Sequence, residues 1–130
     1  MIERTNAPAL SQPPGYSHVV VASGSRLVTT AGAVPLDAEG NLVGAGNLLV
    51  QARQTLENLA LTLEAVGARE QDVIKITVYY VVAGERADLG SVWNAVQESD
   101  IAGTASTLLG VSMLAIEGQL VEIEAVAVLE

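Results

Sequence analysis

One stretch of the chain decides the fold, and it reads Asp72-Val73-Ile74-Lys75-Ile76-Thr77-Val78-Tyr79-Tyr80-Val81-Val82. Most of its residues are β-branched or aromatic, and residues of these kinds are enriched in strands. The apolar run is nearly continuous rather than alternating, which is typical of a strand that is covered on both faces. We therefore predict a long central strand over residues 72–82, buried on both faces.

A helix is predicted on each side of this strand. Before it, apolar residues recur at helical spacing over residues 48–66, with Asn47 as the N-cap and Gly67 just beyond the end. After it, residues 86–99 carry a weaker helical pattern that includes Trp93. The chain is thus expected to pass from helix to strand to helix.

Four further strands are predicted around this unit. Residues 19–22 and 27–33 flank the turn Ser23-Gly24-Ser25 and predict a hairpin. Residues 106–114 and 120–129 predict two more strands, and the last of these alternates between apolar and mostly acidic positions.

The predicted order is β-β-α-β-α-β-β, in a single domain over residues 1–130. Strands and helices in this order indicate an α+β sandwich, a mixed sheet with two helices on one face. The other face of the sheet is rich in Val and Leu and has no predicted cover. Because an uncovered apolar sheet face indicates an interface, we expect the chain to form an oligomer.

The composition argues against several classes of function. The chain has no cysteine, a single histidine (His18) and a net charge of −9. Disulfides, thiolate nucleophiles and metal sites rich in cysteine or histidine are therefore excluded, and we predict no metal and no cofactor. The six basic residues are scattered, so nucleic-acid binding is not expected. No apolar run is long enough for a membrane span and the first residues show no signal pattern, so we expect a cytoplasmic protein without membrane contact.

Five parts of the sequence resemble, in order and at matching separations, the patterns of one protein family. They are Gly15–Val20, Thr29–Ala33, Gln51–Leu59, Leu63–Gly67 followed by Asp72–Tyr79, and Leu120–Ala127. Together they resemble the YjgF/RidA family, the reactive intermediate deaminases that are also called L-PSP endoribonuclease-like proteins. The resemblance implies a chorismate-mutase-like fold of the bacillus type and a homotrimer with ligand clefts between subunits. It also implies hydrolysis of reactive enamines and imines, such as 2-aminoacrylate, to a keto acid and ammonia.

The same resemblance implies that the chemistry has changed. In members of the RidA type, an arginine within a Pro-Ala-Arg-Ser segment binds the substrate carboxylate. The matching residues here are Thr104-Ala105-Ser106-Thr107, so Ser106 takes the place of the arginine. Ala31 and Ala33 also depart from the family pattern. Losing a bidentate charge-assisted pair costs on the order of 3 kcal/mol. We therefore predict a divergent branch of the family that is not a usual 2-aminoacrylate deaminase.

Glu122 is the candidate catalytic residue. It matches the family glutamate that is thought to position water, and a partly buried carboxylate in a cleft can act as a general acid or base. The alternative is a solvated or trimer-lining glutamate without a chemical role. His18 is interpreted as a structural residue, and because no other imidazole exists, Ser106 has no histidine–acid pair to activate it as a nucleophile.

Six residues are candidates for substrate binding, namely Tyr16, Ala31, Gly32, Trp93, Ser106 and Thr107. The Tyr16 ring would stack on a planar substrate, and the amide of Gly32 would face a ligand oxygen. The hydroxyls of Ser106 and Thr107 would donate hydrogen bonds from a strand end. Packing roles are the alternative, and for Trp93 the pattern favours a core or interface anchor.

The sequence leaves three functions open. The first is a hydrolase that acts on the C–N bond of a small imine or enamine, whose substrate either lacks a carboxylate or binds it through backbone amides. The second is a non-catalytic trimer that holds a small metabolite in the same clefts. The third, an endoribonuclease or translation inhibitor, is disfavoured by the net charge of −9 and the lack of a basic groove.

Overall fold

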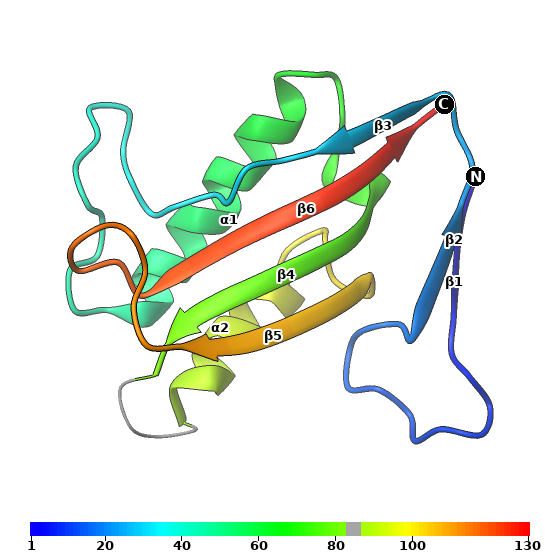
Figure 1. Cartoon of the computed structure of the whole chain (residues 1–130), viewed down its shortest axis with the longest axis horizontal. Coiled ribbons are helices and arrows are strands. Elements are labelled where there is room, and N and C mark those ends of the chain that lie inside the picture. The colour runs from blue at the N-terminus through cyan, green and yellow to red at the C-terminus, as the bar shows by residue number, and fades with distance from the viewer. Residues whose placement is uncertain (83–86) are drawn as a thin grey trace.

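The computed structural model describes residues 1–82 and 87–130 and contains a four-stranded mixed sheet with both helices behind it (Figure 1). The strands lie in the order β3-β6-β4-β5, with bounds Arg26–Thr29, Val121–Leu129, Val73–Val81 and Ala105–Val111. The pairs β3–β6 and β6–β4 are antiparallel, whereas β4 and β5 are parallel. The predicted α+β class, with two helices on one face of a mixed sheet, is confirmed.

The two helices begin and end close to where their patterns predict. Helix α1 spans Leu48–Glu64, and its N-cap Asn47 accepts a hydrogen bond from the Val50 amide at 3.0 Å through Oδ1. The chain leaves α1 through Gly67, whose φ of 77° suits glycine. Helix α2 spans Ala87–Glu98, and residue 86, where its prediction began, lies outside the described residues. Among the described residues, neither helix is long and apolar enough to cross a membrane.

The hydrophobic core lies between the helices and the sheet. Alternate residues of β6 point toward the helices and are buried, namely Val121, Ile123, Ala125, Ala127 and Leu129. They meet α1 through side chains such as Leu59 and Leu63, which are also fully buried. The predicted alternation of β6 is therefore confirmed. The residues between the buried ones point to the opposite side of the sheet, where they are available for roles other than core packing.

Strand β4 is central, as predicted, but only one of its faces is buried in the single chain. Ile76 and Val78 are buried toward the helices, whereas Lys75, Thr77 and Tyr79 on the other face are half-buried. The prediction of burial on both faces was wrong for one chain because α1 and α2 pack on the same side of the sheet. We call the opposite side the helix-free face; it carries Leu27, Thr77, Tyr79, Thr107, Leu109, Glu122 and Glu124.

The predicted hairpin over residues 19–22 and 27–33 was wrong. Strand β2 (Val19–Ala22) pairs with β1 (Ile2–Thr5) in a separate two-stranded sheet, whereas β3 pairs with β6. The turn between β2 and β3 explains this, because the amide of Ser25 donates to the carbonyl of Leu129 at the end of β6. The chain is therefore anchored on β6 before β3 begins, and the two strands separate instead of pairing.

Candidate functional site

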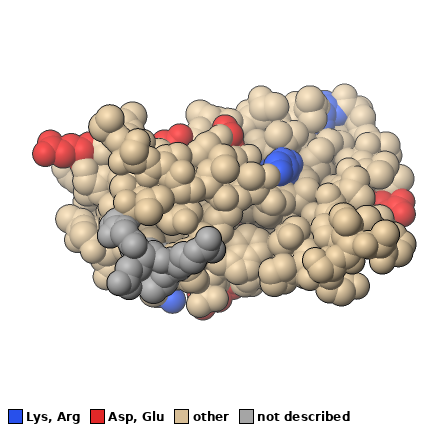
Figure 2. All heavy atoms as spheres, turned by 60° about the horizontal axis from the view of Figure 1, so that its bottom comes forward, with Lys and Arg blue, Asp and Glu red and all other residues tan. Residues whose placement is uncertain are grey.

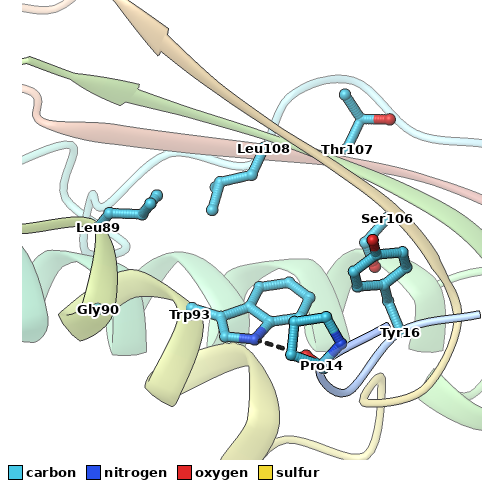
Figure 3. A pocket seen from close by; sticks show the side chains of 8 residues that line it. All are labelled: Pro14, Tyr16, Leu89, Gly90, Trp93, Ser106, Thr107 and Leu108. Carbon is cyan, nitrogen blue, oxygen red and sulfur yellow. Dashed lines mark hydrogen bonds between the residues drawn. The ribbon is translucent and has the colours of Figure 1, made fainter. Parts of the chain in front are cut away.

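A cavity of about 730 Å³ lies between the edge strand β5, helix α2 and the loop that precedes β2 (Figure 3). Its described lining residues are Pro14, Tyr16, Leu89, Gly90, Trp93, Ser106, Thr107 and Leu108. Four of the six residues predicted to bind substrate are among them, from segments far apart in the sequence. The volume falls within the range of about 300–1,000 Å³ that is usual for small-molecule pockets.

The loop before β2 is fixed to α2 by hydrogen bonds. The indole Nε1 of Trp93 donates to the carbonyl of Pro14 at 3.0 Å, and Gln97 Nε2 donates to the carbonyl of Gly15 at 3.1 Å. Gly15 has a φ of 87°, and a Cβ there would lie 2.2 Å from Gln97 Oε1, so this position requires glycine. As a result, the ring of Tyr16 stands edge-on to Trp93, with 6.2 Å between ring centroids.

Ser106 and Thr107 are neighbours on β5 but point to opposite sides of the sheet. Ser106 Oγ donates to the carbonyl of Thr104 at 3.1 Å and lies beside Tyr16, whereas Thr107 points away from the other labelled side chains (Figure 3). Thr107 Oγ1 accepts a hydrogen bond from Lys75 Nζ at 2.6 Å. Ser106 thus presents an oxygen with free lone pairs to the cavity, while Lys75 is held on the helix-free face.

Glu122 and Gly32 form a second group on β6 and the chain after β3. Glu122 Oε1 accepts a hydrogen bond from Gln119 Nε2 at 3.0 Å. Glu122 Oε2 lies only 2.1 Å from the position that a Cβ on Gly32 would occupy. The missing Cβ of Gly32 therefore admits a side chain rather than a second backbone, and that side chain is the candidate catalytic carboxylate.

The backbone at Ala31 and Gly32 leaves the β3–β6 ladder. The Ala125 amide donates to the side chain of Thr30 at 3.0 Å, and regular pairing resumes at Ala33, whose amide donates to the carbonyl of Ile123 at 2.7 Å. Between these bonds, the amides of Ala31 and Gly32 have no hydrogen-bond partner within residues 1–82 and 87–130. Two N–H groups are therefore left without a partner among these residues, and one of them belongs to Gly32, which lies against Glu122.

The two groups of candidate residues do not meet within one chain. Ser106 is level with Ala125 across the sheet, since both pair with Ile76, and Ala125 is three residues from Glu122. Ser106 and Glu122 are therefore two strands apart, at about 4.8 Å per strand, and three residues apart along the strand direction, at about 3.3 Å per residue. Because these two offsets are at right angles, the Cα atoms lie about 14 Å apart. The two side chains also point to opposite faces, so Glu122 cannot reach a ligand beside Ser106 of its own chain.

The comparisons with known proteins agree with this fold. A Rid-family protein of unknown function from Yersinia pestis has a TM-score of 0.90 and 32% identity, covering 98% of each chain. The family model described as Endoribonuclease L-PSP matches residues 5–129. The chain belongs to the Rid family.

Curated Rid relatives cover nearly the full length of the chain. A RutC family protein of Synechocystis is 32% identical over 130 residues, which is 99% of this chain and 95% of that protein. The Salmonella typhimurium protein named 2-iminobutanoate/2-iminopropanoate deaminase is 31% identical and covers 98% of this chain and 95% of its own length. A mouse protein of the same name is 32% identical, with coverage of 98% and 90%.

The cavity of this Rid chain also contains residues that the sequence analysis missed. Leu89, Leu108 and Pro14 line the cavity. Outside the cavity, Gln119 was also missed, although it donates a hydrogen bond to Glu122. Leu89 and Leu108 were assigned only to a helix or strand pattern, and periodicity does not distinguish a core position from a cavity wall. His18 lies outside this lining, and its Nδ1 accepts a hydrogen bond from the Ala7 amide at 3.1 Å.

Charge around the site is sparse. None of the described residues that line the cavity is charged. Figure 2 brings forward the side that lies at the bottom of Figure 1, and the few charged side chains visible there lie apart from one another.

On the helix-free face, Tyr79 donates a hydrogen bond to Glu124 Oε1 at 2.5 Å, and this bond raises the pKa of Tyr79. No group of three or more potential metal-ligating side chains occurs in the described part of the chain.

Proposed function

We propose that this Rid-family chain is a deaminase-like hydrolase that acts on a small imine or enamine. The site would be a cleft between two copies of a homotrimer in the cytoplasm. One copy would supply Tyr16, Trp93 and Ser106 around the cavity, and a second would supply Glu122 and Gly32. The observation that carries the proposal is the division of these residues into two groups that cannot meet in one chain.

The chemistry would follow from the position of Glu122. Its carboxylate would accept a proton from water as the water oxygen bonds to the carbon of the C=N group. That proton would pass to nitrogen, which completes the carbinolamine. The carboxylate would then take the hydroxyl proton of the carbinolamine and deliver it to nitrogen, so that ammonia leaves as the C–N bond breaks and the C=O bond of the carbonyl product forms. General acid–base catalysis of this kind contributes about 10²–10⁴-fold to a rate. The hydrogen bond from Gln119 would keep the carboxylate oriented.

The helix-free face supports association of copies. Leu27 on β3 and Leu109 on β5 are 70% and 43% exposed on this face. The two leucines lie on the opposite edge strands of the sheet, with Glu122, Glu124, Thr77 and Tyr79 between them, so they support contacts at both edges of this face rather than one apolar patch. The proposal therefore expects this face to be covered by the neighbouring copies of the chain.

Ser106 would alter the substrate preference of the site. A serine hydroxyl does not replace a guanidinium that binds a carboxylate in a bidentate manner, and the difference is on the order of 3 kcal/mol. Imines such as 2-iminopropanoate, which the deaminase relatives are named for, would then be poor substrates. The sequence departures at Ala31 and Ala33 accompany this change.

A non-catalytic trimer that holds a small metabolite is the second candidate. One observation favours it: Oε1 of Glu122 is bound by Gln119 and Oε2 lies against Gly32, so the carboxylate is already enclosed. Such a protein would be stabilised by its ligand without turnover. An endoribonuclease function, suggested by the family description, has little support because the net charge is −9.

The test is ammonia release from an imine generated in solution by an amine or amino-acid oxidase. The wild-type chain should raise the rate above the spontaneous one, and Glu122→Gln should remove about 10²-fold or more of that gain. Glu124→Gln is the matched control, because it makes the same change two residues away on the same strand and face. Equal rates with and without the protein, or equal rates for Glu122→Gln and wild type, would exclude this mechanism.

A further inference from the structure

We infer that the cavity beside Ser106 selects an uncharged ligand with a branched or cyclic apolar group, rather than a small carboxylate. This inference deepens the proposed function, on which it rests for the reaction. The preference itself follows from the lining of the cavity. It therefore applies whether the bound molecule is hydrolysed or only held.

The walls of the cavity are mostly apolar. Leu89, Leu108 and Trp93 are half-buried, and Pro14 closes the side next to Trp93 (Figure 3). A three-carbon imino acid would leave most of the roughly 730 Å³ unfilled. Wall atoms without a partner lose their dispersion contacts, so a larger apolar group gains more from this space than a small acid does.

Two polar groups at the cavity, the Ser106 hydroxyl and the Trp93 N–H, suit a ligand donor rather than an anion. Ser106 Oγ donates to the Thr104 carbonyl, and with this bond made it presents its lone pairs to the cavity. The Trp93 N–H is already bound to the Pro14 carbonyl. A ligand N–H, as in an amide or an imine, can donate to Ser106, whereas a carboxylate would lose its hydration and face another acceptor.

Lys75 and Arg4, two cations within the part of the chain that the structure describes, are engaged outside the cavity. Lys75 Nζ is bound to Thr107 on the helix-free face, and Arg4 Nη2 donates to the carbonyls of Gln71 and Val73 at the start of β4. Neither group is placed to balance a ligand carboxylate beside Ser106. The described lining thus gives an anion no charged partner.

The free amides of Ala31 and Gly32 are the alternative anion site, if a second copy brings them to the cavity. Gly32 is in contact with Oε2 of Glu122. A ligand carboxylate there would be repelled by a like charge at close range. The same amides favour a neutral carbonyl oxygen, which matches the product of imine hydrolysis.

The substrate class that follows is a neutral imine, R–CH=NH or R₂C=NH. Water adds across the C=N bond, the C–N bond then breaks, and the products are the aldehyde or ketone and ammonia. No oxidant or further reactant is needed. The group R would occupy the space between Trp93 and Leu108, with the imine N–H directed to Ser106.

Trp93 allows the preference to be measured without turnover, because it is the only tryptophan in the chain and it lines the cavity. Full-length protein is titrated with cyclohexanecarboxamide and with cyclohexanecarboxylate, two molecules of nearly equal shape that differ in charge. Indole fluorescence reports the affinity of each. We expect the amide to bind at least tenfold more tightly than the carboxylate, a difference of about 1.4 kcal/mol.

The variant Ser106→Arg should reverse this order and raise the affinity for the carboxylate at least tenfold. Ser25→Arg, in the exposed turn between β2 and β3, adds the same charge away from the cavity and should leave both affinities unchanged. Equal affinities, tighter binding of the carboxylate to wild type, or no response to either probe up to about 10 mM would overturn the inference. Amide preference without imine hydrolysis would support the inference and count against the proposed function alone.

Discussion

Replacing Gly32 by alanine should displace the Glu122 side chain and destabilise the fold. This destabilisation should disappear when Glu122 is itself replaced by alanine. A Cβ at position 32 would lie 2.1 Å from Oε2, 2.6 Å from Cδ and 2.7 Å from Cγ of Glu122. Since Cγ is included, the whole side chain must change rotamer, and its hydrogen bond from Gln119 is lost. Overpacking of about 1 kcal/mol and a lost charge-assisted hydrogen bond of about 1.5 kcal/mol outweigh the gain of about 0.5 kcal/mol from replacing glycine.

The expected net cost of Gly32→Ala is about 2 kcal/mol in the free energy of unfolding, or a fall of about 8 °C in Tm. Urea unfolding of Gly32→Ala, Glu122→Ala and the double variant, at one protein concentration, forms a double-mutant cycle. In the Glu122→Ala background the steric conflict is absent, so Gly32→Ala should be neutral or slightly stabilising. If the two substitutions instead add within about 0.5 kcal/mol in the double variant, the close contact is not what position 32 provides.

Two further predictions concern single hydrogen bonds. Asn47→Ala removes the side chain that caps α1 through the Val50 amide, so urea unfolding should show a loss of about 1 kcal/mol; an unchanged midpoint would contradict the cap. Because the bond to Glu124 raises the pKa of Tyr79, the folded state holds the phenolic proton more tightly than the unfolded chain. The resulting stabilisation is complete below the unfolded pKa of about 10 and is lost as the pH rises through the folded pKa. Absorbance titration of Glu124→Gln should show one tyrosine ionising at lower pH than in wild type, and identical curves would contradict this assignment.

Much of the fold could be predicted because its strongest patterns are local. The period of α1, the apolar run of β4 and the alternation of β6 each follow from the side chains of one segment. Strand pairing between distant segments does not leave such a trace. The partner of β3 is fixed by contacts between Ser25 and Leu129, 104 positions later, so the sequence favoured the nearer strand β2 incorrectly.

The candidate site shows the same limit. Tyr16, Trp93 and Ser106 were predicted together and their side chains face one cavity, because the resemblance supplied positions that sequence periodicity alone does not. Thr107, predicted with them, contributes to the lining but turns its side chain to the helix-free face. Their separation from Glu122 was not predicted, since it depends on the register between β4, β5 and β6. The apolar walls Leu89 and Leu108 were missed because such residues look alike in a core and in a pocket.

Complementation between two variants tests most directly whether the site is shared between copies. Glu122→Gln and Tyr16→Ala each disable one of the two groups, and the two proteins are mixed in equal amounts, unfolded and refolded together. A site is intact only when its cavity comes from the first variant and its Glu122 from the second, so imine hydrolysis should recover to about a quarter of the wild-type rate. A mixture no more active than the two variants measured separately would contradict the account, because both groups would then act within a single chain.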